Sequence, residues 1–475
     1  MNTAPTSGEE AIPIATLSSH SSKRIQSLDV LRGIAVLGAL LVSIWVFGGF
    51  STQQQNHFLL QSKGGNYRLF GAIDLLFNGK MRAMIALVFG AAIILFFTKQ
   101  NSTYNKPVGD VFINRQFWLI LFGLVNAVVF LWTQDILFHL GIMGILLFPF
   151  IRLSYRGLFI AALVTTLIYC GKNYWQYSDK QKVYSKYLAV TALEKKYQKD
   201  SVNKASKGIK ATKDTLSKLQ NEDKKAWEGL LSGMKPDLKK DDQNNKAMRS
   251  NDYGKIWNHL LPALQSREAQ WTYQFGFWDL SSTIFLGMAL YKRGYFESRF
   301  SPNQYLAFGL LLLTGGLLLG WFRLHFHQIS LQDFTRYVKN NPVPYDILFP
   351  IERCLTALGY TCLILFFLAK GIMSRLWKAF SCVGQLSLTH YLMQSLFCTI
   401  FFYGYGMGYY GRLSQLQLYF IVAELIMVQI VFSVLWLKHF HYGPAEWLLR
   451  RLSYGRQLQP IAKPTADTPI ETVLN

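Results

Sequence analysis

The chain is poor in acidic residues and in cysteine. Its 475 residues include 27 aspartates and glutamates against 49 lysines and arginines, and the formal net charge is +22. The five cysteines show no Cys-x-x-Cys spacing, so neither a zinc site nor a disulfide framework is supported. A cleaved signal peptide is not expected either, because the apolar block that follows the polar residues 1–23 is too long and lacks a small-residue cleavage site.

Apolar residues, by contrast, are abundant and occur in blocks. Hydrophobic residues make up 51% of the chain, aromatic residues make up 15%, and the mean hydropathy is +0.17. The basic residues collect beside the apolar blocks, where they orient helices against an anionic leaflet. We therefore expect a polytopic membrane protein whose partner is the lipid bilayer, and we expect no nucleic-acid binding.

Ten segments predict transmembrane helices, given the roughly 20 residues that a helix needs to cross a hydrocarbon core. The predicted fold class is an all-α integral membrane bundle with about ten transmembrane helices. The segment 67–77 is predicted to be re-entrant or interfacial. The predicted spans are residues 30–50, 82–98, 116–133, 136–151, 157–171, 275–291, 304–324, 349–370, 380–402 and 415–437.

The positive-inside rule assigns both termini to the cytoplasm, because this orientation places every short basic cluster on one side of a bacterial-type inner membrane. The segment 172–272 then lies outside, and its apolar residues at helical spacing predict surface helices. This lysine-rich loop is either a lid or partner-docking domain, or a solvated insertion without chemistry. The predicted organisation is a cytoplasmic tail at 1–23, membrane helices at 24–171, the loop at 172–272, membrane helices at 273–440 and a cytoplasmic tail at 441–475.

Polar residues inside or beside the spans are the candidates for function, since ionisable groups are costly to bury in a membrane. Two of them, Asp135 and His139, are four residues apart and share a helix face. A carboxylate can orient an imidazole and raise its basicity, so both are predicted catalytic residues for a reaction on an alcohol or amine. The alternative is that Asp135 caps the helix and satisfies His139. The full set is Asp29, Arg32, Arg82, Asp135, His139, Asp279, Glu352, Arg353, His390 and Gln394.

A second cluster of polar residues lies within the helix predicted at 380–402. Ser387, His390 and Gln394 lie along one stripe of this helix, and such a stripe must face protein or water rather than lipid. These three residues are predicted to line a substrate cavity. Hydrogen bonding between helices explains the stripe equally well.

Three charged residues are candidates for binding a coenzyme. Asp29 and Arg32 stand at the mouth of the first helix, and Arg82 opens the second span. A buried arginine can bind a phosphate, a carboxylate or the diphosphate of a coenzyme, although Arg82 could also extend to the membrane interface. The His325/His327 pair fits a metal site no better than a wet loop. We expect no metal and no permanently bound cofactor.

Several motifs occur together in one order along nearly the whole chain, and they resemble the YeiB-like membrane proteins, a family classed as a domain of unknown function (418). Ser43 and His390 stand where members of that family usually carry Asn. The motifs are Ser27-Leu-Asp29-Val-Leu-Arg32-Gly33, Gly79-Lys80-Met-Arg82 with Phe89-Gly90, Asp135-Ile-Leu137, Leu286-Gly287-Met288, the run from Gly384 to Ser395, and Gly443-Pro444-Ala-Glu446-Trp447.

The Asp-x-x-Arg-Gly opening and the ten-helix layout also resemble, more distantly, membrane acyltransferases that acetylate sugars with acetyl-coenzyme A. In those enzymes a histidine near the outer face is thought to mediate transfer, and His139 is the residue in a comparable location here, within a different motif. The resemblance implies transfer of an acyl group from acyl-coenzyme A to a cell-envelope glycan or small molecule. The alternative is a transporter or exporter of a small polar solute. The sequence predicts no particular oligomeric state.

Overall fold

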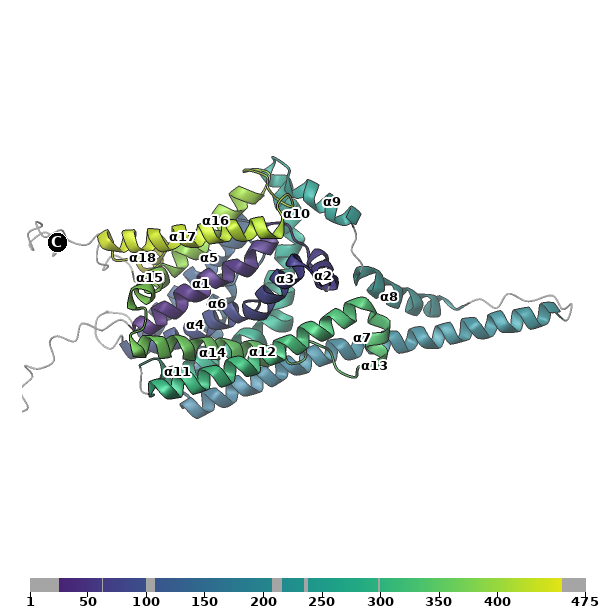
Figure 1. Ribbon diagram of the computed structural model, residues 1–475, viewed down its shortest axis with the longest axis horizontal. Helices are drawn as coiled ribbons and strands as arrows, with labels where there is room; N and C mark the ends of the chain where they lie inside the picture. Colours follow the sequence, from purple (N-terminus) through teal and green to yellow (C-terminus); the bar gives the residue numbers. More distant parts are fainter. Residues whose placement is uncertain are drawn as a thin grey trace, which may run out of the picture.

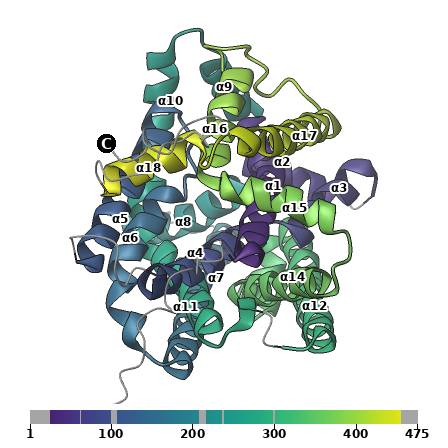
Figure 2. The ribbon, with the colours of Figure 1, turned by 90° about the vertical axis from the view of Figure 1, so that its left-hand side faces the viewer.

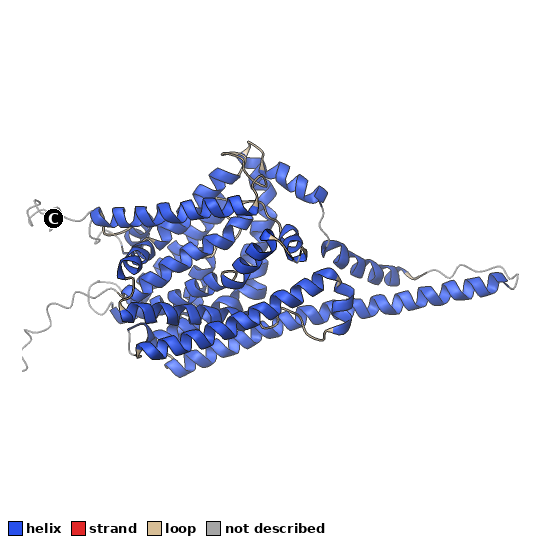
Figure 3. Ribbon diagram, viewed as in Figure 1, coloured by secondary structure: helices blue, strands red, loops and turns tan. Residues whose placement is uncertain are grey.

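Every regular element in the part of the chain that the structure describes is a helix (Figure 3). This computed structural model describes residues 25–61, 63–99, 107–206, 216–234, 238–297 and 300–454. The predicted tail at 1–23 and the last part of the tail at 441–475 lie outside these residues. The all-α prediction is therefore confirmed for the described residues.

The first half of the chain supplies six helices of the bundle and the start of a long seventh. Short π- and 3₁₀-helical segments, labelled η, join some of them. The elements are α1 (Gln26–Phe47), α2 (Thr52–Leu60), α3 (Gly65–Leu76), α4 (Lys80–Lys99), α5 (Val108–Leu124), η2 (Val125–Val129), α6 (Leu137–Leu147), η3 (Phe148–Arg152) and α7 (Tyr155–Ser206).

The second half begins with short helices outside the bundle and returns to it at α11. Its elements are α8 (Lys218–Met234), α9 (Leu238–Met248), α10 (Tyr253–Gln265), η4 (Ser266–Gly276), α11 (Phe277–Lys292), η5 (Tyr295–Glu297), α12 (Pro302–Gln332), α13 (Phe334–Asn340), α14 (Phe349–Lys370), α15 (Ser374–Gln385), α16 (Ser387–Phe402), α17 (Gln415–His439) and α18 (Pro444–Tyr454).

The long helices lie side by side along the longest axis of the molecule (Figure 1). The beginning of α1 and the helix α18 lie at the same end of the bundle, on the left of Figure 1. Viewed from that end, α1, α4, α5, α6, α15 and α18 come into view together (Figure 2). We call this the α1 end of the bundle.

Apolar side chains cover the outside of the bundle as well as its core. Only 22% of the most apolar stretch of α12 is buried, and the same fraction holds for α17. Their exposed residues include large aliphatic side chains such as Leu311 and Met427. An apolar surface of this extent suits lipid rather than water. The protein is therefore a helical membrane bundle.

Six helical segments are long and apolar enough to cross a membrane among the described residues, namely 26–47, 65–98, 108–129, 302–332, 349–370 and 415–439. The prediction of ten spans is not supported. The segment 380–402 is divided at Leu386 into α15 and α16. The segment 136–151 forms the 11-residue α6 and a 3₁₀ turn, and 275–291 yields the 16-residue α11. The prediction was wrong at these segments because hydropathy depends on composition alone and does not show where a helix is interrupted.

The predicted span 157–171 is the beginning of α7, which has 52 residues and continues through position 172 without a break. At 1.5 Å per residue such a helix is about 78 Å long, far more than a bilayer needs. Its distal part projects beyond the bundle (Figure 1). There Trp227 of α8 is fully buried, with ring centres 4.8 Å from Tyr184 and 5.6 Å from Phe334.

Two helix pairs approach so closely that only glycine fits between them. A Cβ atom added to Gly287 of α11 would overlap with the carbonyl oxygen of Leu87 in α4, and one added to Gly384 of α15 would overlap with that of Asp29 in α1. These contacts hold α4 against α11 and α1 against α15, and both pairs border the polar residues described below.

We expect Gly287→Ala to lower the melting temperature of the detergent-purified protein, because the added methyl group must push α4 and α11 apart. Overpacking of this kind costs about 1–3 kcal/mol. The matched control is Gly171→Ala in α7, where no atom lies within 4 Å of the added Cβ. Equal melting temperatures for Gly287→Ala and the wild type would show that the two helices are not in close contact.

Candidate functional site

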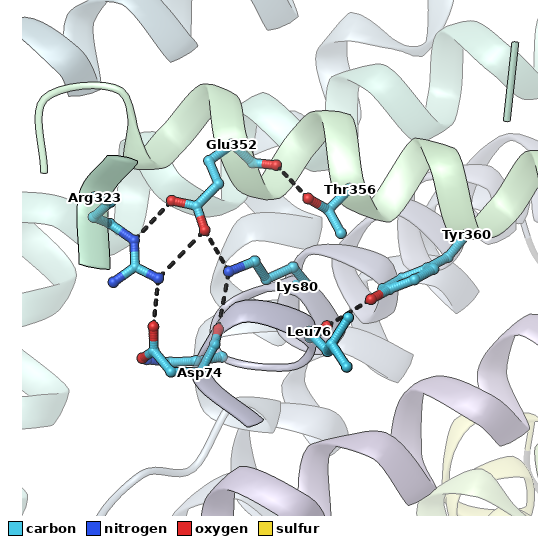
Figure 4. A network of polar contacts seen from close by, with 8 residues as sticks. Asp74, Leu76, Lys80, Arg323, Glu352, Thr356 and Tyr360 are labelled. Carbon is cyan, nitrogen blue, oxygen red and sulfur yellow. Dashed lines mark hydrogen bonds and ion pairs between the residues drawn. The ribbon is translucent and has the colours of Figure 1, made fainter. Parts of the chain in front are cut away.

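A network of two cations and two carboxylates joins four helices inside the bundle (Figure 4). Lys80 of α4 lies with its Nζ atom 2.5 Å from Oε1 of Glu352 in α14. Arg323 of α12 donates from Nε to Oε2 of Glu352 over 2.7 Å and from Nη2 to Oδ2 of Asp74 in α3 over 2.5 Å. All four residues are buried, so each charge depends on its partners.

A second ion cluster lies directly beside the first. Asp279 of α11 is paired through Oδ2 with Nε of Arg82 at 3.1 Å and through Oδ1 with Nη1 of Arg353. Arg353 also donates to the backbone carbonyl of Asp279 over 2.9 Å. Arg82 is two residues after Lys80, and Arg353 is one residue after Glu352. The same two helix ends, those of α4 and α14, therefore hold both ion clusters.

His139 lies close to this second cluster, and the segment η4 covers it. Its ring is fully buried, and Nε2 is 3.5 Å from Oε2 of Glu268. The Trp271 ring centre is 5.1 Å away. The same indole is approached by the guanidinium carbons of Arg82 at 5.3 Å and Arg267 at 3.5 Å. An imidazole and two guanidinium groups thus surround one tryptophan, and a carboxyl group approaches the imidazole.

Several polar atoms of this cluster have no hydrogen-bond partner among the described residues. They include both carboxyl oxygens of Glu268 and Nε of Arg267. Buried polar groups are usually satisfied, and a cluster of unsatisfied ones is a feature of functional sites. Burial raises the pKa of Glu268 to about 8, and the nearby negative charge of Asp135 acts in the same direction. This carboxyl group can therefore exchange a proton near neutral pH.

The Asp135 carboxylate caps the start of α6 and does not contact the imidazole of His139. Its Oδ2 accepts a hydrogen bond from the backbone N–H of Phe138 over 2.8 Å, at the start of α6, and its Oδ1 accepts one from Asn126 over 2.7 Å. The carboxyl group that approaches His139 is that of Glu268, which is 129 positions further along the chain. Of the two roles considered for Asp135, the geometry corresponds to the cap.

A cavity of about 690 Å³ extends from the α1 end of the bundle to the beginning of α6. Its volume is within the range typical of small-molecule and cofactor sites, roughly 300–1,000 Å³. Arg32 of α1, Arg115 of α5 and Arg450 of α18 line it, together with apolar residues of α4 and α5. At its inner end are Ile136 and Tyr391, whose hydroxyl group accepts a hydrogen bond from the Ile136 N–H over 3.0 Å.

The three predicted coenzyme-binding residues do not meet. Asp29 and Arg32 both line the cavity and form an ion pair with each other, with 3.3 Å between Oδ1 and Nη1. Arg82 stands at the start of α4, beside Trp271, and is not among the residues that line the cavity. The structure thus separates Arg82 from the other two.

The three residues of the predicted polar stripe on α16 have different surroundings. Ser387 lines the cavity. His390 is buried, with 2.5 Å between its Nε2 and Oγ of Ser433 in α17, and Gln394 donates to Gln429 of α17 over 3.0 Å. These two side chains make the contacts between helices that were considered as the alternative to a cavity. No group of three or more His, Cys, Asp or Glu residues suited to a metal is found in the described ranges.

Sequence reasoning missed several residues of these clusters. Asp74 and Arg323 are charged residues inside apolar segments, a signal that hydropathy alone averages away. Glu268, Arg267 and Trp271 belong to the segment interpreted as the extracytoplasmic loop. Nothing in the local pattern of that segment indicates that it folds back over His139.

We expect Glu352→Gln to destabilise the protein strongly, because Lys80 and Arg323 would lose a carboxylate in a buried environment. Breaking a buried pair on one side costs about 3–5 kcal/mol. Thermal unfolding in detergent measures this loss. The control is Asp179→Asn, which removes a surface partner of Lys182 whose side chain is 68% exposed. A similar, small effect of both variants would contradict a stabilising role for the buried network.

Comparisons with known proteins give a family but no established activity. A family model described as a protein of unknown function (DUF418) matches residues 290–456. The uncharacterized protein YeiB of Escherichia coli (strain K12) is 26% identical over 449 residues, which cover 91% of this chain and 96% of YeiB. The uncharacterized protein YxaH of Bacillus subtilis (strain 168) is 24% identical over 450 residues, which cover 94% of this chain and 98% of YxaH.

A shorter similarity, 30% identity over 108 residues, relates 23% of this chain to an uncharacterized 39.9 kDa protein of Bacillus acidopullulyticus. No solved structure matches the chain significantly. The family model covers the second half of the bundle, including Arg323, Glu352 and Tyr391, and the two bacterial relatives extend the similarity over nearly the whole length. Together these similarities support a YeiB-like DUF418 family for the chain.

Proposed function

We propose that this protein is a membrane acyltransferase that transfers an acyl group from acyl-coenzyme A to a hydroxyl or amino group of a cell-envelope glycan or small molecule. The observation that carries the proposal is a buried histidine, His139, that lies beside the Glu268 carboxyl group and beside a tryptophan contacted by two guanidinium groups. Its helix, α6, begins with residues that line the arginine-lined cavity. A coenzyme has negatively charged phosphates at one end and a thioester at the other, and arginine is well suited to bind the phosphates.

The ionisable groups around His139 lie at one depth, as a single reaction centre requires. Arg82, His139 and Asp279 are each the third residue of their helix, and Glu352 and Arg353 are the fourth and fifth residues of α14. Since these helix beginnings are joined by ion pairs or by contacts with Trp271, they form one layer across the bundle. A transporter would instead need groups distributed along the membrane normal.

In the proposed reaction His139 acts as the general base. It takes the proton from the acceptor hydroxyl or amine while the acceptor atom bonds to the acyl carbon. The carbon–sulfur bond then breaks, and the imidazolium returns the proton to the departing thiolate. Glu268 orients the imidazole. Asp135 supports this arrangement by fixing the start of α6.

The proposal includes an orientation. We place the α1 end of the bundle, with both termini, in the cytoplasm of a bacterial-type inner membrane, and the distal part of α7 outside. The six long apolar segments then cross the membrane, and the shorter helices α6, α11 and α16 pack against them. The basic residues at the α1 end, such as Arg152, Lys292 and Arg375, support this orientation through the positive-inside rule.

Thiol labelling tests the orientation in a variant whose five native cysteines are replaced by serine. We expect Lys182→Cys on the projecting part of α7 to react with a membrane-impermeant maleimide in intact spheroplasts. Arg375→Cys at the start of α15 should react only after permeabilisation. Both positions are exposed, so access to the side chain does not limit labelling. The reverse pattern would require the opposite orientation of the bundle.

Acyl transfer is tested with acetyl-coenzyme A and the protein in bacterial membranes. We expect His139→Gln to reduce thiol release and labelling of envelope material by about a hundredfold or more, as loss of a general base does. His390→Gln is the matched control, because His390 is equally buried but is bonded to Ser433. Normal abundance of both variants shows that they fold. Full activity of His139→Gln would remove this residue from the mechanism, and solute uptake without thiol release would favour a transporter.

A further inference from the structure

We infer that Arg82 and Arg267 form a subsite for an acidic acceptor, a sugar or small molecule that carries a carboxylate or phosphate beside its nucleophile. This inference rests on the proposed acyl transfer and names the class of its second substrate. The subsite is the half-exposed rim over His139, formed by residues of α4 and η4.

The geometry places both cations next to the proposed base. Arg82 comes from the bundle and Arg267 from η4, yet their guanidinium carbons lie 5.3 Å and 3.5 Å from the centre of one ring, that of Trp271. The His139 ring centre is 5.1 Å from the centre of the same tryptophan. An anionic group held by the two arginines would therefore bring a neighbouring hydroxyl or amine close to the imidazole.

The proposed binding groups are more exposed to solvent than the proposed base. The Arg82 side chain is 26% exposed and Arg267 is half-buried, whereas His139 is fully buried. A ligand that enters from outside thus meets the cationic rim before it reaches the histidine. This order suits a site in which the arginines select the ligand and the histidine acts on it.

An unused hydrogen-bond donor at the rim favours an anion. Asp279 is engaged by Arg82 and Arg353, whereas Arg267 is left without a paired carboxylate at hydrogen-bond distance among the described contacts. The Nε atom of Arg267 is buried without a hydrogen-bond partner in the described part of the chain. A buried donor left unsatisfied is costly, and a carboxylate or phosphate can accept from two arginine nitrogens at once.

The rim is distinct from the arginines assigned to the acyl donor. Arg32, Arg115 and Arg450 line the cavity that opens at the α1 end, and neither Arg82 nor Arg267 is among the lining residues. Ile136 and Tyr391 mark the inner end of this cavity, close to the helix that carries His139. Donor and acceptor would thus reach the histidine from different sides, as transfer across a membrane requires.

Binding of matched acidic and neutral probes to the full-length protein in nanodiscs tests the inference. The probes are methyl β-glucuronide against methyl β-glucoside, and glucose 6-phosphate against glucose. We expect an acidic probe of at least one pair to bind about tenfold more tightly than its neutral partner, as one charge-assisted contact allows. The two pairs distinguish a carboxylate from a phosphate.

Arg267→Gln should abolish this preference for an acidic probe, and Arg82→Gln should do the same if the variant folds. Arg293→Gln is the control, because Arg293 is exposed and contacts Tyr155 away from the site. The inference is overturned if each pair of probes binds equally to the wild type, or if Arg267→Gln keeps the preference.

The change in melting temperature on adding acetyl-coenzyme A tests the proposed function separately from the acidic subsite. A wild-type shift that is lost in Arg115→Ala but kept in Arg267→Gln supports a donor site apart from the acidic subsite. If the acidic preference fails while this shift persists, the subsite is wrong and acyl transfer stands. If acetyl-coenzyme A gives no shift while the Arg267-dependent preference is present, the anion subsite stands and the assignment of acyl transfer fails.

Discussion

The pairing of charges inside an apolar bundle is the constraint on which the rest of this structure depends. Lys80 and Glu352 are almost completely buried, and a charge that loses its partner in such surroundings costs several kcal/mol. Arg323 contacts both Asp74 and Glu352, so α3, α4, α12 and α14 cannot shift relative to one another without breaking a pair. Lipid provides no alternative partner for these groups, which makes the constraint stricter than it would be in water.

This constraint also determines where the candidate site is formed. Arg82 and Arg353 follow Lys80 and Glu352 on the same helix ends, and Asp279 joins them from α11. Because η4 runs directly into α11, fixing α11 also fixes the segment that carries Glu268 and Trp271 over His139. The residues proposed for chemistry are therefore positioned by helices whose own places are set by ion pairs and by the close contact at Gly287.

The proposed function depends on two groups of arginines that the structure keeps apart. One group lines a large cavity at the α1 end, together with apolar side chains. The other forms a half-exposed cationic rim around one tryptophan. A reaction that takes an acyl group from one side of a membrane and delivers it to the other needs two such groups near a single base, whereas a structural bundle needs neither.

The sequence by itself determined the all-helical membrane class and most of the apolar segments, because periodicity and composition are local signals. It also singled out Asp279, Glu352 and Arg353 as candidates, since an ionisable residue in an apolar run is a local signal too. The tertiary structure alone decided the breaks that leave six clear spans, and it alone identified the partners of each charge. Glu268 reaches His139 across 129 positions, and Glu352 reaches Lys80 across 272. Such pairs depend on how helices distant in the chain pack together, and no local pattern in the sequence records that packing.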